Sequence, residues 1–195
     1  TWIVTWNLPI RKVATLRISP WHAEPTNPIL RLLWIYCYRS AYKIILQTEE
    51  QGEYFSESVR KKCIVIPNPI NDVYLQSYKD TPAGGMCRWM AVGRIVPQKN
   101  YPMMIRAFAQ LVTTNPNIQL DIYGEGEDPC YVETIRMLIA NLGLAGRVFL
   151  RGRCEQMHEE YRKHDLFLMA SDCEGMPNAL MEAMASGLVC ISTDC

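Results

Sequence analysis

The stretch DLFLMASDCEGMPNALMEAMASGLVCIST, residues 165–193, decides the fold class. Both of its ends are short, continuous apolar runs, which predicts buried strands at 165–171 and 188–193. The segment between them, 177–187, has proline near its start and glycine at its end, as helices commonly do. A strand, a helix and a second strand in this order form a βαβ unit. Such units build parallel sheets that are covered by helices.

The same alternation runs through the rest of the chain. The sequence predicts further strands at 13–19, 43–48, 62–67, 86–93, 118–124 and 147–152. It predicts further helices at 27–42, 49–58, 101–115, 130–143 and 154–164. Residues 67–85 interrupt the pattern with three prolines, two glycines and no sustained periodicity, so we expect a linker there. This organisation predicts an α/β protein with parallel sheets that carry helices on both faces.

Composition excludes several classes of protein. The 195 residues hold 20 Lys and Arg against 20 Asp and Glu, so no overall positive charge favours nucleic acid. No apolar run approaches the roughly 20 residues of a membrane span, and the first residues lack a signal-peptide pattern. The eight cysteines are scattered without a CxxC pair, which favours buried, reduced thiols in the cytoplasm. The chain opens and closes at predicted strands, so we expect a partial chain.

Ligands of parallel α/β sheets bind at the carboxyl ends of the strands, and the loops there carry suggestive residues. The first, GRIVPQKN (93–100), offers Gly93 for a close backbone approach. It also offers two cations, Arg94 and Lys99, that can hold a phosphate. Taken alone, solvated surface cations explain this loop equally well.

Two further loops hold glycines after strands. YGEGED (123–128) places Gly124 directly after a predicted strand, although a tight turn accounts for it as well. LRGRCEQM (150–157) contains Gly152, which lets a flat group lie against the backbone. An ordinary turn with solvated arginines is the alternative for this second loop.

The loop that enters the helix at Pro177 is the most informative. The first amides of a helix point outward and attract anions, here those of Asn178, Ala179 and Leu180. Glu174 precedes them, and Glu182 lies roughly 7–8 Å further along the helix from Pro177. Two carboxylates beside an anion site suit a bound anion that carries hydroxylated groups on both sides. Glu182 also sits among apolar neighbours, so its carboxylate should have a partner.

Together these segments resemble a known family. EGMPNALMEAMASG resembles the E-x₇-E signature of retaining, nucleotide-sugar-dependent glycosyltransferases of GT-B architecture, the family-4-like members of group 1. VGRIVPQKN resembles the phosphate-binding segment of that family, IYGEGED its G-x-G turn and VFLRGR its loop that contacts the base. The order and spacing of the four agree across residues 86–195.

The resemblance implies two doubly wound, Rossmann-like domains. Residues 1–67 would be the later part of an incomplete acceptor-side domain, 68–85 the linker, and 86–195 a truncated donor domain. Arg94, Lys99 and Glu174 would be catalytic. The donor would be bound by Gly93, Gly124, Arg151, Gly152, Arg153, Gly175, Met176, Pro177, Asn178, Ala179, Leu180 and Glu182. In particular, Glu174 would bind the donor sugar, Glu182 the ribose, and the loop Arg151–Arg153 the base.

The resemblance also implies what the first half and the cofactors would be. Many members have a histidine that contacts the donor sugar, and His22 or Arg17 would take that position. No cofactor and no essential metal are expected, because the nucleotide sugar is itself the substrate. The Gly-rich loop and the C-terminal helix of the family are not in these 195 residues, so we expect this fragment itself to be inactive.

The expected activity is transfer of a hexose, with retention, from a nucleotide-diphosphate sugar such as a UDP-sugar. The acceptor would be a sugar or a lipid-linked intermediate in the synthesis of polysaccharide or lipopolysaccharide. Two alternatives stay open: a non-catalytic protein of the same fold that binds nucleotide sugars, and a nucleotide-sugar epimerase. The expected location is the cytoplasm. The basic aromatic segment RLLWIYCYRSAYK (31–43) suits either the inner membrane surface or an ordinary core helix.

Overall fold

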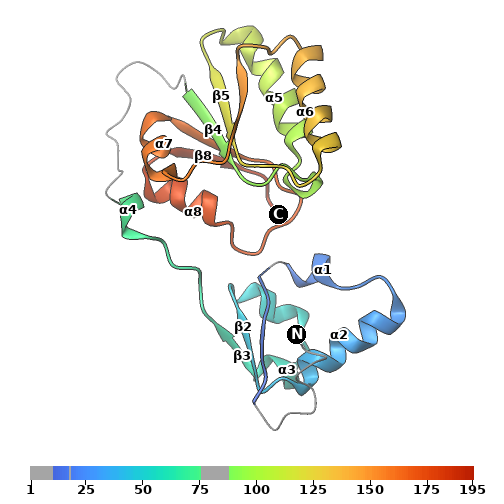
Figure 1. Cartoon of the computed structure of the whole chain (residues 1–195). Coiled ribbons are helices and arrows are strands. Elements are labelled where there is room, and N and C mark those ends of the chain that lie inside the picture. Colours follow the sequence, from blue (N-terminus) through green and yellow to red (C-terminus); the bar gives the residue numbers. More distant parts are fainter. Residues whose placement is uncertain (1–10, 18, 76–87) are drawn as a thin grey trace. The chain divides into compact units, whose positions relative to one another are not determined.

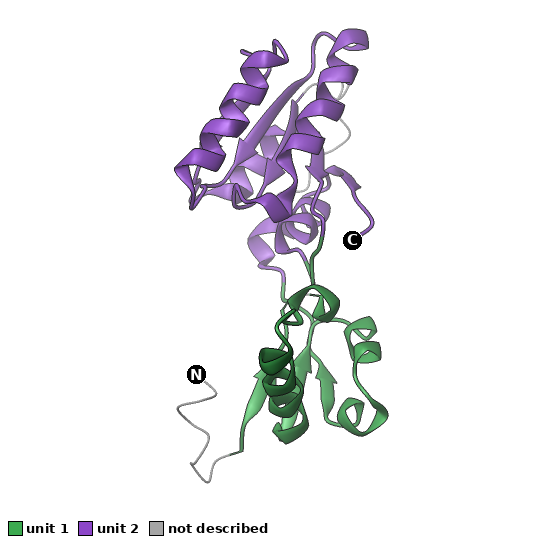
Figure 2. Cartoon of the chain, turned by 90° about the vertical axis from the view of Figure 1, so that its right-hand side faces the viewer, with its two compact units in different colours: residues 1–69, 173–176 green, residues 70–172, 177–195 purple. Residues whose placement is uncertain are grey.

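The computed structural model describes residues 11–17, 19–75 and 88–195, and the chain divides into two units (Figures 1 and 2). Unit 1 comprises Thr1–Pro69 together with the loop Cys173–Met176, and unit 2 comprises Ile70–Asp172 and Pro177–Cys195. The chain thus passes between units at the start of the predicted linker. That linker was expected to lack periodic structure, but it includes a short helix, α4 (Asp72–Leu75). Its residues 76–85 lie outside the described part.

Unit 1 contains a parallel sheet in the order β1-β2-β3, formed by β1 (Val13–Thr15), β2 (Lys43–Leu46) and β3 (Cys63–Val65). The predicted strand at 13–19 is shorter than expected, because Pro20 starts a helical turn; its residue 18 lies outside the described part. The helical elements are α1 (Pro20–Ala23), α2 (Pro28–Ser40), η1 (Glu50–Tyr54) and α3 (Glu57–Arg60).

The start of α2 follows from its sequence. Asn27 caps the helix by accepting hydrogen bonds from the amides of Ile29 and Leu30, at 3.0 and 3.3 Å. Pro28 occupies the first turn, where its missing N–H is not needed. The inward face of α2 packs through Tyr38 onto a core that includes Ile44 and Phe55.

Unit 2 is built on a five-stranded parallel sheet in the order β6-β5-β4-β7-β8. Its strands are β4 (Arg88–Val92), β5 (Gln119–Tyr123), β6 (Val148–Gly152), β7 (Leu166–Met169) and β8 (Val189–Ser192). The helices are α5 (Tyr101–Thr114), α6 (Pro129–Asn141), α7 (Met157–Lys163) and α8 (Asn178–Ala185), with a 3-10 turn η2 (Pro97–Lys99).

Two separate cores cover the two faces of this sheet. Neighbouring residues of β4 point to opposite sides, so Ala91 packs with α5 and α6 while Met90 packs with α7 and α8. Figure 1 shows α5 and α6 on one side of the sheet and α7 and α8 on the other. The prediction of a parallel sheet with helices on both faces is therefore confirmed.

The order of the strands fixes where a ligand can enter. From β4 the chain winds outward through β5 to β6, then returns to the other side of β4 to form β7 and β8. The direction of winding therefore reverses between β4 and β7. In open α/β sheets the crevice at such a switch point, outside the carboxyl ends of the strands, is where ligands bind.

The cysteines depart in part from the expectation. Seven of them are described and all seven are free thiols, but only Cys173 is buried. Cys130, in the first turn of α6, and Cys195, which follows β8, are exposed. None of the helices in the described ranges is both long and apolar enough to cross a membrane.

A close backbone contact holds the ends of β4 and β5 together. Gly124 has a φ of +139°, and a Cβ placed on it would lie 2.0 Å from the carbonyl oxygen of Gly93. No side chain fits in that space, so glycine is required here for steric reasons as well as for its backbone conformation.

Replacing Gly124 with alanine should therefore destabilise unit 2 by about 3 kcal/mol or more, since backbone atoms must move apart. The matched control is Gly146→Ala. Gly146 also has a positive φ, +82°, but no atom lies within 4 Å of its Cβ position. This control should cost about 1 kcal/mol. Urea denaturation measures the free energy of unfolding of both variants, and an equal loss of stability in the two would contradict the steric explanation.

Candidate functional site

Backbone hydrogen bonds link the loops that follow β4, β5 and β6. The amide of Gly93 donates to the carbonyl of Tyr123 at 2.9 Å, and the amide of Gly124 donates to the carbonyl of Gly152 at 2.8 Å. Three of the glycines predicted to bind the donor are thereby gathered at one edge of the sheet. Gly152 has a φ of +73°, which favours glycine whatever the surrounding space.

The two predicted cations of the first loop have different surroundings. The side chain of Lys99 lies over Gly93, with its Cε 3.2 Å from the position of a Cβ on that glycine. Arg94 points elsewhere in this structure: its Nη1 forms an exposed ion pair with Glu127 at 2.8 Å. An exposed pair of this kind contributes little stability, so Arg94 is free to exchange Glu127 for another anion.

The loop after β7 is tied to the loop after β4 across the switch point. The amide of Asp172 donates to the carbonyl of Gln98 at 2.9 Å, and Asn100 Nδ2 donates to Asp172 Oδ1 at 2.8 Å. Asn100 has a left-handed conformation, with φ 45°, and also caps α5. The walls of the crevice are therefore braced by side chains that the sequence analysis did not select.

The start of α8 receives no cap from the side chain of its N-cap residue. Pro177 precedes the helix as its N-cap residue and offers no side-chain acceptor, and the first turn contains no acidic residue. Helix α8 thus lacks the N-cap side chain that Asn27 provides for α2. Such a helix start favours an external anion.

Glu182 has the partner that its apolar surroundings predict. Its carboxylate is half-buried and accepts a hydrogen bond from the hydroxyl of Tyr161 at 3.2 Å. The hydroxyl of Tyr74, from α4, is within hydrogen-bonding range as well. Burial raises the pKa of Glu182, and the two tyrosines counteract this in part.

Arg151 is held by a buried carboxylate. Its Nε donates to Asp121 Oδ1 at 2.8 Å, and the other carboxylate oxygen is contacted by Arg88 at 3.1 Å and His164 at 2.8 Å. Asp121 is 1% exposed. Burial alone would raise its pKa, but the hydrogen bonds from His164, Arg151 and Arg88 outweigh burial and lower the pKa to about 2. Arg153, two residues further on, is exposed.

The remaining predicted residues belong to unit 1. Glu174, Gly175 and Met176 lie in its loop Cys173–Met176. A Cβ on Gly175 would come within 2.6 Å of the carbonyl oxygen of Arg17, so this glycine is closely packed. His22 is exposed at the end of α1, and its Nδ1 lies 3.3 Å from Ser19 Oγ.

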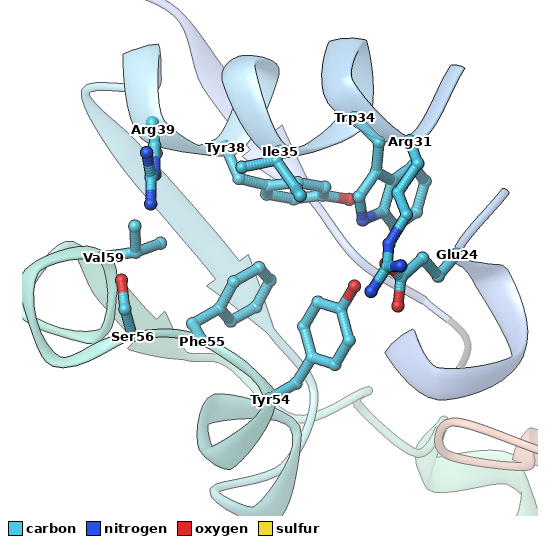
Figure 3. Close-up of a pocket in the computed structure, with 10 residues that line it drawn as sticks. All are labelled: Glu24, Arg31, Trp34, Ile35, Tyr38, Arg39, Tyr54, Phe55, Ser56 and Val59. Atoms are coloured by element: carbon cyan, nitrogen blue, oxygen red, sulfur yellow. The ribbon is translucent and has the colours of Figure 1, made fainter. Parts of the chain in front are cut away.

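Unit 1 also has a pocket of about 250 Å³ (Figure 3). Its walls combine four aromatic side chains with charged groups, contributed by α2, η1 and the residues around them. An ion pair between Glu24 and Arg31 closes one end, and Figure 3 shows the Tyr54 hydroxyl facing it. The aromatic lining consists of Trp34, Tyr38, Tyr54 and Phe55. A mixed aromatic and polar surface of this kind can hold a hydroxylated ring.

A metal site is not evident. Within residues 11–17, 19–75 and 88–195, no three His, Cys, Asp or Glu side chains converge in a geometry that could hold a metal ion.

Comparison with known proteins assigns the family. Residues 87–195 match the family model described as glycosyl transferases group 1, which covers more than half of the chain. The chain belongs to this family. It is 30% identical over 180 residues to an uncharacterized glycosyltransferase of Methanocaldococcus jannaschii, covering 87% of this chain and 44% of that protein. It is 25% identical to the amylovoran biosynthesis glycosyltransferase AmsD of Erwinia amylovora, covering 88% of this chain and 49% of that protein.

A solved structure shares the fold of this group 1 chain. The Anabaena protein HepE, crystallised in complex with UDP-glucose, superposes with a TM-score of 0.82 at 20% identity. The match covers 98% of this chain and 56% of HepE. The predicted resemblance and fold class are confirmed. The chain spans less than half the length of the two curated relatives.

Some parts of the site were not found from sequence. Glu127, Asp121 and Tyr161 each bind a predicted site residue, but they lie between 21 and 33 positions away from it. No spacing rule connects residues so far apart, although a carboxylate inside the apolar strand QLDIY was a signal that cations lie nearby.

The cluster around Asp121 generates a stability prediction. Asp121→Asn leaves two arginines without their shared counter-charge and His164 without its carboxylate partner, so the free energy of unfolding should fall by about 3 kcal/mol at pH 7. The pKa of Asp121 is lower in the folded state than in the unfolded state. Its contribution is therefore present above the unfolded value near 4 and is lost as pH falls towards about 2.

The difference between wild type and Asp121→Asn should accordingly shrink below pH 4. Chemical denaturation at pH 7, 5, 4 and 3 measures it. The exposed pair of Glu133 with Arg136 serves as the control, because Glu133→Gln should change stability by less than about 0.5 kcal/mol. A difference that stays constant from pH 7 to pH 3 would refute the linkage.

Proposed function

We propose that the protein containing this chain transfers a hexose from a UDP-sugar to a sugar or lipid-linked acceptor, with retention at the anomeric carbon. The observation that carries the proposal is the arrangement at the switch point of unit 2. Three glycine turns, the amino group of Lys99 and the start of α8 all lie at the carboxyl edge of one sheet. That edge is suited to a diphosphate.

The cations would stabilise the leaving diphosphate. Lys99 is held over Gly93, where it can act as a point charge on a phosphate oxygen. Arg94 would exchange its exposed pair with Glu127 for the diphosphate. Positive charge placed in advance where negative charge develops is electrostatic catalysis, and it lets the transfer proceed without an essential metal ion.

The flanking residues would select the rest of the donor. Glu174 would accept hydrogen bonds from the sugar hydroxyls, with the backbone of Gly175 and Met176 beside it. Glu182 would accept those of the ribose. Arg151 donates its Nε to Asp121, so contact with the base would come from its remaining guanidinium N–H groups, from Arg153 and from the backbone at Gly152.

The acceptor would be bound by unit 1. Its aromatic and polar pocket (Figure 3) is a concavity suited to a sugar ring. Several relatives carry names that refer to cell-surface glycans, among them amylovoran biosynthesis and lipopolysaccharide core biosynthesis. These names support a role in the synthesis of such a polymer, and we place that role in the cytoplasm as part of the proposal.

Substitution in the complete protein tests the assignment of the catalytic residues. Lys99→Ala and Glu174→Ala should each lower the rate of sugar transfer about 100-fold or more, because each removes a group that contacts the reacting end of the donor. Thermal melting should stay within a few degrees of wild type. Lys163→Ala is the control: it removes an exposed lysine that pairs with Glu160, and transfer should be unchanged.

The same assay separates the alternatives. Wild-type turnover in Lys99→Ala or Glu174→Ala would overturn the site. Binding of UDP without any turnover would favour a non-catalytic binding protein, and conversion of the donor to its epimer without acceptor would favour an epimerase.

We further propose that α2 rests on the inner face of an anionic membrane. Five large apolar side chains of this one helix are each more than half exposed: Ile29, Leu30, Leu32, Leu33 and Tyr36. Cations gather at its end, from Arg39, Lys43 and Lys62. An exposed apolar face with a basic edge is typical of helices that lie in the membrane interface.

Vesicle flotation tests the membrane proposal. Leu32→Glu combined with Leu33→Glu should reduce flotation with vesicles containing phosphatidylserine at least tenfold, with no loss of stability, since both side chains are exposed. Met137→Glu, an exposed apolar residue of α6, should float like wild type. Equal flotation of all three proteins, or no flotation of wild type, would contradict the proposal.

A further inference from the structure

Glu182 is a half-buried carboxylate that is held by neutral donors. Within the described ranges no Lys, Arg or His forms an ion pair with it, and its carboxylate accepts a hydrogen bond from the Tyr161 hydroxyl at 3.2 Å. Other carboxylates of unit 2 do pair with cations, as Glu127 does with Arg94. A buried charge without a cation needs several hydrogen bonds.

The two tyrosines come from different elements and support each other. Tyr161 lies on α7 and is fully buried, and its single hydroxyl hydrogen is shared between Glu182 and the carbonyl of Ala179, which lies 3.1 Å away. Tyr74 lies on α4, the first element of unit 2 after the chain leaves unit 1. Their rings meet edge to face, with centroids 5.6 Å apart. Tyr74 packs in the same apolar core as Tyr161, where α4 contacts α8, and its hydroxyl also interacts with the Glu182 carboxylate.

The number of unoccupied acceptor positions on the Glu182 carboxylate determines what else it can bind. A carboxylate offers about four acceptor positions on its two oxygens. Two tyrosine hydroxyls fill two of them, which leaves two for a pair of neighbouring hydroxyls. Hydrogen bonds from the tyrosine hydroxyls restrict rotation of this carboxylate. Its remaining acceptor positions are therefore already oriented when a diol binds.

We propose that Tyr161 and Tyr74 are positioning residues that hold the Glu182 carboxylate in the orientation that accepts the two ribose hydroxyls of the donor. This inference rests on the proposed function, in which Glu182 binds the ribose. It adds two residues that reach the donor through Glu182 and make no contact with it themselves. Burial raises the pKa of both tyrosines, so both remain protonated donors at neutral pH.

Calorimetry with two nucleotides tests the proposal in the complete protein. The probes are UDP and 2′,3′-dideoxy-UDP, which lacks both ribose hydroxyls. Tyr161→Phe and Tyr74→Phe should each raise the Kd for UDP about fivefold, the effect of one lost hydrogen bond. Neither should change the Kd for the dideoxy nucleotide, because the oriented acceptors have nothing to bind there.

A matched control removes the same kind of bond elsewhere. The hydroxyl of Tyr123 donates to Glu160 at 2.6 Å on the same side of the sheet. Tyr123→Phe should leave the Kd of both nucleotides unchanged. If Tyr161 or Tyr74 had a merely structural role, its substitution would raise the Kd for both nucleotides equally. That outcome would overturn the inference.

Glu182→Gln distinguishes this inference from the proposal beneath it. If Glu182→Gln binds UDP like wild type, or if wild type binds no UDP, the ribose assignment fails and the positioning role fails with it. If Glu182→Gln binds UDP more weakly than wild type but both tyrosine variants bind it like wild type, only the positioning role is wrong.

Discussion

The parallel pairing of β4 with both β5 and β7 is the constraint on which the rest of unit 2 depends. It sets the point where the direction of winding reverses, and it brings the loops after all three strands to one edge. The pairing continues past the strand ends, because Gly93 and Gly124 each donate a backbone hydrogen bond to the neighbouring strand or loop. The contact of Gly124 with the Gly93 carbonyl leaves no room for a side chain, so the loops are fixed by backbone and not by packing that could vary.

The charged side chains near that edge fall into a buried group and an exposed group. Asp121 is buried and collects Arg88, Arg151 and His164, so this part of the charge serves the fold. Arg94 pairs with the exposed carboxylate of Glu127, and Lys99 lies over Gly93 at the carboxyl edge of the sheet, where we propose that both cations contact a ligand. The difference arises from burial: a carboxylate taken out of water holds its cations firmly, whereas an exposed carboxylate gives them up at little cost.

Helix α8 carries two features of the proposed site, a helix start that favours an anion and the Glu182 carboxylate. Its first turn favours an anion, and Glu182, one turn further along, is oriented by hydroxyl groups. Those hydroxyls come from α4 and α7, which pack against α8 through the same apolar core as Phe167 and Ala183. Packing on the inner face of α8 therefore determines what its polar face can bind.

The sequence by itself determined the order and type of nearly every element. Strand and helix signals are local, arising from apolar runs, proline at helix starts and glycine at helix ends, as at Pro28 and Gly187. It also determined the candidate loops, because ligands of parallel sheets bind at strand ends. Among the described elements, α1, α4 and η2, each of three or four residues, were missed, and the helix expected at 49–58 is divided into η1 and α3. Runs this short have too few residues for a periodic pattern.

The tertiary structure alone decided which charged side chains are available to a ligand. Arg94 and Arg151 read alike in the sequence, since each stands beside a glycine near the end of a strand. One has an exposed partner and the other is held by a buried aspartate 30 residues away. Likewise, the tyrosines that face Glu182 are brought to it by packing between helices. These contacts join residues far apart in the chain, and no local pattern encodes them.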